Sequence, residues 1–154
     1  EQACRDGARI LSGGQQPDQF ETGYFYEPTV LDNISPAMEI VTEESFSPVI
    51  PIQIVRSMEE AIEQSNSTKY GLGCCIYTND IDRAMTAAEE IKSGTICINN
   101  PLMENIAAPF GGMKQSGIGR EHGQEALDEF REPKHIFIDY KQSKKDWWFG
   151  VEGE

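Results

Sequence analysis

The feature that most constrains the fold is an alternation of apolar runs and amphipathic stretches between residues 49 and 99. The apolar runs predict three strands: Val49 to Val55, Leu72 to Tyr77 and Thr95 to Asn99. The two stretches between them carry apolar residues at helical spacing. Such an alternation favours right-handed crossovers in one parallel sheet. The predicted fold class is therefore α/β, a βαβαβ parallel sheet with flanking helices.

Both predicted helices have start signals. Ser57 and Glu60 have the spacing of a capping box, which opens a helix with Met58 and Ile62 on one face. A second helix is predicted after Asn79 or Asp80, because both residue types cap helices. Its apolar face consists of Ile81, Ala84, Met85, Ala88 and Ile91.

Outside this region the pattern is less regular. Residues 1–11 predict the end of a helix that runs into a strand, followed by a loop marked by Gly13 and Gly14. Residues 24–31 are aromatic and β-branched around Pro28, which suggests an irregular or edge strand. Residues 120–131 predict a helix that buries Ala126, Leu127 and Phe130, and residues 135–140 predict a late strand.

Composition excludes several classes of function. A chain of 154 residues with net charge −13 is one domain's worth of protein and lacks the clustered cations that bind nucleic acid. No apolar run approaches the roughly 20 residues that span a membrane. The four cysteines show no CxxC spacing and only two histidines accompany them, so we expect no metal site. They are expected to be reduced packing thiols of a cytoplasmic protein.

Glycines concentrate in the run from Ala107 to Glu121, which also holds Phe110. Glycine is used where backbone bends sharply or approaches a ligand closely, so this loop could wall a ligand site or simply form a long surface turn. It does not match a dinucleotide fingerprint, because Gly117, Gly119 and Gly123 have the spacing GxGxxxG and no strand ends at the first glycine.

This run and the earlier run Thr42 to Val49 resemble, in order and spacing, two motifs of the NAD(P)-dependent aldehyde dehydrogenases. The resemblance implies that the chain is the C-terminal third of such an enzyme. Residues 1–132 would belong to its catalytic domain, and residues 133–154 would form an oligomerisation strand and a tail. Trp147, Trp148 and Phe149 of that tail would be interface anchors.

The resemblance also implies roles for single residues. Glu44 would accept hydrogen bonds from the ribose hydroxyls of NAD or NADP, with NAD favoured, and Phe46 would pack beside the nicotinamide. Without the family, the favoured interpretation of Glu44 is an exposed acid on a turn. The chain departs from the family in one respect, because Ser47 stands where glycine is usual, which affects the shape of this loop.

Substrate contacts are implied at two positions. Phe110 would lie against the aldehyde, and Glu104 would favour a cationic aldehyde, since the surrounding sequence is similar to betaine-aldehyde and aminoaldehyde dehydrogenases. A solvated surface charge is the open alternative for Glu104. The strand at 135–140 would join a neighbouring subunit and make a homo-oligomer.

The family's nucleophilic cysteine, in a Gly-Gln-x-Cys setting, and its water-activating glutamate are absent from these 154 residues. We therefore predict that the parent oxidises an aldehyde to a carboxylic acid with NAD(P)+ through a thiohemiacetal, whereas this chain alone is inactive. Two alternatives stay open: a non-enzymatic α/β interaction module, and the related glutamylphosphate and semialdehyde reductases.

Overall fold

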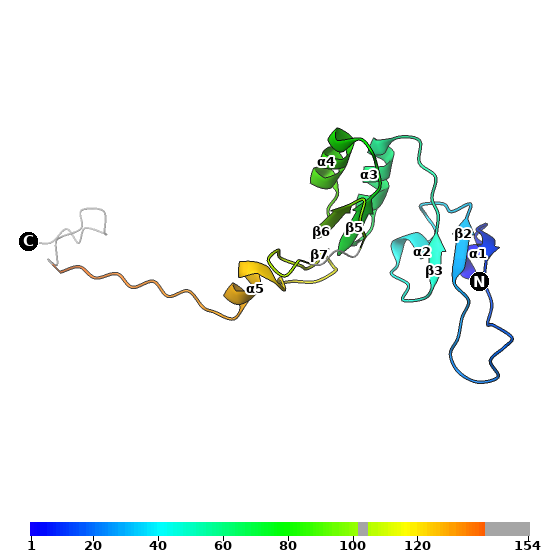
Figure 1. Cartoon of the computed structure of the whole chain (residues 1–154), viewed down its shortest axis with the longest axis horizontal. Coiled ribbons are helices and arrows are strands. Elements are labelled where there is room, and N and C mark those ends of the chain that lie inside the picture. Colours follow the sequence, from blue (N-terminus) through cyan, green and yellow to red (C-terminus); the bar gives the residue numbers. More distant parts are fainter. Residues whose placement is uncertain (102–104, 141–154) are drawn as a thin grey trace, which may run out of the picture.

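The computed structural model describes residues 1–101 and 105–140. It places the strands in three separate small sheets (Figure 1). The first is three-stranded, in the order β1 (Arg9–Ser12), β2 (Thr29–Asp32) and β3 (Val49–Pro51). The others are the pairs β4 (Tyr70–Gly71) with β7 (Met113–Lys114), and β5 (Gly73–Ile76) with β6 (Thr95–Ile98).

The first sheet lies at the N-terminal end of the molecule with two short helices, α1 (Gln2–Arg5) and α2 (Glu39–Thr42) (Figure 1). Its strands β1 and β2 are antiparallel, and β2 and β3 are parallel. Helix α1 running into β1 confirms the prediction for residues 1–11. Strand β2, in contrast, is central and not an edge strand. Pro28 directly precedes it, so the missing proline N–H leaves the strand's hydrogen bonds intact.

The second part of the molecule follows the predicted alternation. Helix α3 (Met58–Ser67) and helix α4 (Ile81–Glu90) lie on one side of the parallel pair β5–β6 (Figure 1). Ser57 caps α3 by accepting a hydrogen bond from the Glu60 amide at 3.2 Å, and Asp80 caps α4 by accepting from the Arg83 amide at 3.1 Å. Both predicted helices and both of these strands are confirmed.

The hydrophobic core of this part lies between the helices and the strands. Ile62 of α3 packs with Ala87 and Ile91 at the end of α4. Four half-buried side chains complete the cluster: Met58, Cys74, Ile76 and Ile96. The apolar side chains that recur at helical spacing in α3 and α4 therefore pack against those that alternate along β5 and β6.

The prediction of a single βαβαβ sheet is wrong for its first strand. Residues 49–51 pair with β2, in the register Thr29 to Val49, and not with β5. The strand is also short. Pro51 ends it, and the backbone from Ile52 onward leads to the N-cap of α3. Apolar periodicity predicts a strand but does not choose its neighbour, since a β2 partner satisfies the same pattern.

The predicted helix at 120–131 is shorter than expected. Helix α5 covers only Gly123–Glu129, because Glu121 is held by backbone hydrogen bonds to Phe110 and His122 has a positive φ of 61°. Leu127 and Phe130 are 56% and 90% exposed, so the prediction that they are buried is wrong.

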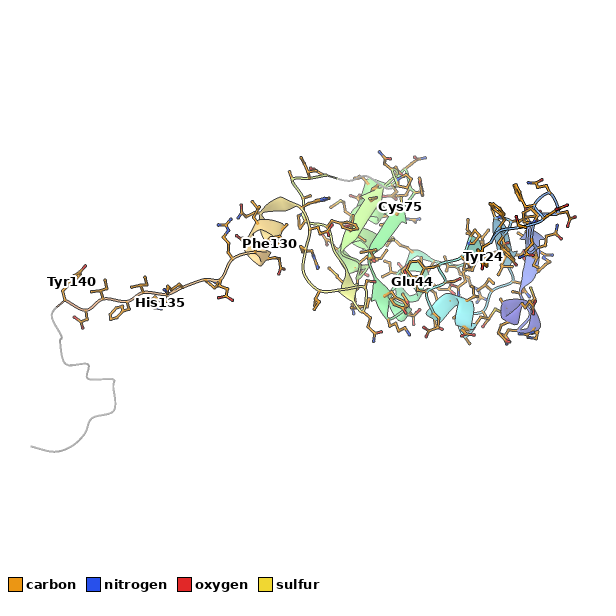
Figure 2. All side chains as sticks on the ribbon, turned by 90° about the horizontal axis from the view of Figure 1, so that it is seen from below. Tyr24, Glu44, Cys75, Phe130, His135 and Tyr140 are labelled. Atoms are coloured by element: carbon orange, nitrogen blue, oxygen red, sulfur yellow. The ribbon has the colours of Figure 1, made fainter. Side chains whose placement is uncertain are left out.

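The segment from 135 to 140 forms no strand within the described residues. Figure 2 shows Phe130, His135 and Tyr140 on a stretch of chain that runs away from the sheets. Ile136, Phe137 and Ile138 are 71%, 72% and 61% exposed. An extended segment becomes a strand only with a hydrogen-bonding partner, so the expected oligomerisation strand is not seen here.

Candidate functional site

The loop between α2 and β3 carries Glu44, which is exposed. Glu44 is one of four acidic residues, with Glu1, Glu39 and Glu43, that line a cavity of about 800 Å³ between this loop, helix α1 and the first sheet. The lining also includes Arg5, Tyr26 and Thr29. Thr29 is buried and its hydroxyl accepts a hydrogen bond from the Gly14 amide at 2.8 Å, so one wall of the cavity is fixed. A single acceptor-only carboxylate at the rim can bind a pair of hydroxyl groups.

The neighbouring carboxylate, Glu43, has a different role. Both of its oxygens accept hydrogen bonds from the Lys69 ammonium, at 2.8 and 2.7 Å. This contact raises the pKa of Lys69 above its ordinary value, chiefly through the hydrogen bond. Glu43 is therefore engaged with the segment that precedes β4, although it lines the same cavity as Glu44.

The backbone of this loop accommodates Ser47 at the position where the family usually has glycine. The hydroxyls of Ser45 and Ser47 form a hydrogen bond across Phe46. Ser47 is not among the residues with a positive φ, so a side chain is tolerated there without strain. The Phe46 ring is 96% exposed and is not part of the cavity lining, so the structure does not bring it together with Glu44 around one space.

Phe110 lies at a second cavity, of about 550 Å³, on the side of β5 and β6 away from the helices. The ring of Phe110 lies 6.4 Å from that of His122, and both line the cavity with Pro109, Cys75 and Cys97. Sequence reasoning missed His122 and the two thiols. Strand alternation could have found the thiols, because Cys75 must face away from the helix-packed Cys74.

The glycine-rich loop holds Phe110 by several close approaches. Phe110 and Glu121 exchange two backbone hydrogen bonds of 2.7 Å, and the Arg120 guanidinium donates to the carbonyls of Gly112 and Gly119 at 2.9 and 2.7 Å. A Cβ atom on Gly94 would lie only 1.7 Å from the carbonyl oxygen of Gly111. The loop is therefore packed against the start of β6, which favours a fixed wall over a loose surface turn.

The remaining candidate residues take no defined part. Glu104, Trp147, Trp148 and Phe149 lie outside the described residues. All four cysteines are free thiols. Burial raises the pKa of the Cys74 thiol above its ordinary value, with smaller contributions from the neighbouring thiols, and this makes Cys74 a poor nucleophile.

Within residues 1–101 and 105–140, no group of three or more His, Cys, Asp or Glu is placed to hold a metal ion. In the same part of the chain, every helix is too short or too polar to cross a membrane.

Comparison with known proteins identifies the family. The family model "Aldehyde dehydrogenase family" matches residues 1–136. Betaine aldehyde dehydrogenase of Bacillus subtilis is 39% identical over 93% of this chain and 30% of its own length. Aminoaldehyde dehydrogenase 1, peroxisomal, of Pisum sativum is 38% identical over 87% of this chain and 27% of its own.

A solved structure supports the same family assignment. The structure of betaine aldehyde dehydrogenase from Staphylococcus aureus in complex with NAD+ superposes with a TM-score of 0.87 at 40% identity, over 97% of this chain and 30% of that chain. The chain belongs to the aldehyde dehydrogenase family. It spans about 30% of the length of these relatives.

Proposed function

We propose that this chain is the C-terminal section of an NAD(P)-dependent aldehyde dehydrogenase that oxidises an aldehyde to a carboxylic acid. The observation that carries the proposal is the fixed glycine-rich loop, which holds Phe110 at a cavity beside the parallel strands β5 and β6. Ligands in α/β proteins bind beyond the carboxyl ends of parallel strands, and this loop follows the carboxyl end of β6. Residues 1–132 would be part of the catalytic domain, and residues 133–154 the oligomerisation strand and tail.

Glu44 is proposed to bind the cofactor, with NAD favoured over NADP. The chemistry of the site fits this group, because an exposed carboxylate at a cavity rim can accept hydrogen bonds from both hydroxyls of a ribose. Phe46, which lies outside the cavity lining, offers an exposed aromatic face for a planar ring. The bound cofactor would supply the hydride acceptor, while Glu44 orients the ribose.

Phe110 and Glu104 are proposed to bind the substrate. The Phe110 ring provides an apolar wall for the aldehyde, and the Glu104 carboxylate favours a cationic one. Relatives named for betaine aldehyde and aminoaldehyde support a substrate that carries a positive charge. The segment 135–140 is proposed to pair with a second copy of the chain. Extended backbone with exposed apolar side chains is a template on which a strand of another chain can pair.

Aldehyde oxidation would need residues beyond this chain. Its four thiols lack the Gly-Gln-x-Cys setting, and the family's water-activating glutamate is not present. We therefore propose that these 154 residues alone do not oxidise aldehydes. A cytoplasmic location stays a prediction, since relatives include a form named peroxisomal.

The test compares NADH formation by an upstream-extended chain and by this chain, with cationic and neutral aldehydes. We expect activity in the extended chain only, and a preference for cationic aldehydes that Glu104→Gln weakens. Glu44→Gln should raise the dissociation constant for NAD+ about tenfold or more, since a hydrogen bond to a charged group contributes about 1.5–3 kcal/mol and each 1.4 kcal/mol is about tenfold in affinity. Glu63→Gln, an exposed acid on α3, is the matched control and should change nothing.

Two results would contradict the proposal. NADH formation by this chain alone would show that it holds its own nucleophile. Inactivity of an extended chain that contains every catalytic element would instead favour the non-enzymatic interaction module, which the exposed apolar segment 136–138 could serve.

A further inference from the structure

Two thiols lie side by side on the face of β5–β6 that the helices do not cover. Cys75 of β5 and Cys97 of β6 are register partners in this parallel pair. Register partners in a parallel ladder point to the same face, and successive residues of a strand point to opposite faces. Cys74 packs against the helix-side cluster and also borders the Phe110 cavity, whereas strand alternation turns Cys75 and Cys97 to the face opposite that cluster, where both line the cavity.

Their surroundings leave the two thiols accessible. Both are free and half-buried, and both line the cavity of about 550 Å³ that Phe110 and His122 share. The pKa of the Tyr77 hydroxyl is raised, chiefly by Cys75, with a smaller contribution from Cys97. Figure 2 marks Cys75 within this second part of the molecule.

The strand spacing decides which chemistry suits the pair. Neighbouring strands lie about 4.8 Å apart. A disulfide needs Cβ atoms about 3.8 Å apart and an S–S bond of about 2.05 Å, so an unstrained disulfide does not fit directly across this ladder. One thiophilic atom placed between the sulfurs lets them stay further apart. Thiolates bind soft metal and metalloid atoms in preference to hard metal ions, so we expect the bridging atom to be a soft one.

We propose that Cys75 and Cys97 form a dithiol site that binds trivalent arsenicals by bridging both sulfurs. With phenylarsine oxide, two As–S bonds form, two S–H bonds and the As=O bond break, and the thiol protons leave with the oxide as one water. Arsenic stays trivalent, so the step needs neither oxidant nor reductant. The phenyl group would occupy the cavity against Phe110. The site does not depend on aldehyde oxidation.

The test begins with the unaltered chain, treated with phenylarsine oxide and then with iodoacetamide. We expect the mass to rise by one phenylarsenic group less two hydrogens. Peptide mapping should show Cys75 and Cys97 protected from alkylation, with Cys4 fully alkylated. The adduct should survive excess monothiol and be removed by a 1,2-dithiol, because chelation raises retention about 10²-fold or more over one thiol.

Four variants then assign the pair. Cys75→Ser and Cys97→Ser should each lower retention of the arsenical in monothiol about 10²-fold. Cys74→Ser, at the neighbouring thiol that packs against the helix-side cluster, and Cys4→Ser, at the exposed thiol of α1, should retain it as the unaltered chain does. Peptide mapping of the unaltered chain needs no variant, so it decides the matter even if a substitution unfolds the protein. Protection of a pair other than Cys75 and Cys97, or adducts that monothiol removes, would overturn the proposal.

Discussion

At the scale of single residues, Arg9 and Asp32 join β1 to β2. They are register partners, and the Arg9 Nε donates to the Asp32 carboxylate at 2.9 Å. This hydrogen bond is the main cause that holds the pKa of Asp32 below its ordinary value. A carboxyl group whose pKa is lowered on folding stabilises the protein above its unfolded pKa of about 3.9. That stability is lost as the pH falls through the lowered, folded value.

Arg9→Gln should therefore lower the urea midpoint at pH 7, and the difference from the unaltered chain should vanish below the folded pKa of Asp32. Urea unfolding of both chains between pH 7 and pH 2 measures this difference in midpoint. Arg56→Gln, at an exposed arginine of the connection between β3 and α3, should leave the midpoint unchanged. A loss of stability that stays constant down to the lowest pH would assign the effect to packing of the arginine stem and not to its charge.

A second residue-scale prediction concerns the close approach at Gly94. Its added Cβ would lie 1.7 Å from the Gly111 carbonyl oxygen, so backbone must move in Gly94→Ala. We expect a loss of about 3 kcal/mol in the free energy of unfolding, at the upper end of overpacking effects. Gly73→Ala is the matched control, because its nearest heavy atom is 4.0 Å away. Equal thermal unfolding of the two variants would show that the glycine loop does not pack against β6.

At the scale of elements, short-range sequence signals correctly predict the helix starts and the strands that depend on neighbouring residues along the chain. Ser57 and Asp80 mark the starts of α3 and α4 because their side chains accept amide hydrogen bonds within three residues along the chain. Strands β5 and β6 also follow from their own apolar runs. The remaining errors concern distant partners: β3 pairs with β2, and the bridge between Phe110 and Glu121 delays the start of α5.

The cap of α4 gives the element-scale prediction. Asp80→Ala removes the side-chain acceptor for the Arg83 amide and should lower the free energy of unfolding by about 1 kcal/mol. Asp80→Asn keeps an acceptor oxygen and should retain most of this stability. Chemical unfolding followed by circular dichroism measures both. If the two variants lost stability equally, the charge of Asp80 and not its cap would be responsible.

At the scale of the whole molecule, the sequence motifs do not predict how the candidate residues are assembled. Glu44 and Phe110 each line a cavity, but the two cavities are different ones. The contact that ties the Glu44 loop to the later part of the chain, Glu43 with Lys69, spans 26 residues. Two exposed charges at that separation have no pattern that a sequence reveals.

Lys69 connects both candidate regions. Its ammonium binds Glu43, next to Glu44, and its carbonyl accepts a hydrogen bond of 3.0 Å from the Gln115 amide in the glycine-rich loop. The pKa of Lys69 is raised by Glu43, so the pair's stabilisation is complete below the unfolded pKa of about 10.4. It is lost as the pH rises through the raised value. Salt should weaken this exposed pair as well.

We therefore predict that Lys69→Met speeds amide hydrogen exchange in the loop at 43–47, and that added salt reduces the difference from the unaltered chain. Glu43→Gln should produce the same change, and the double variant should add nothing to it, because both substitutions remove one interaction. Lys92→Met, at an exposed lysine after α4, is the control and should leave this loop unchanged. Additive effects of the two single substitutions would mean that Glu43 and Lys69 act separately. The position of Glu44 would then be set by the Ser45–Ser47 hydrogen bond within its own loop.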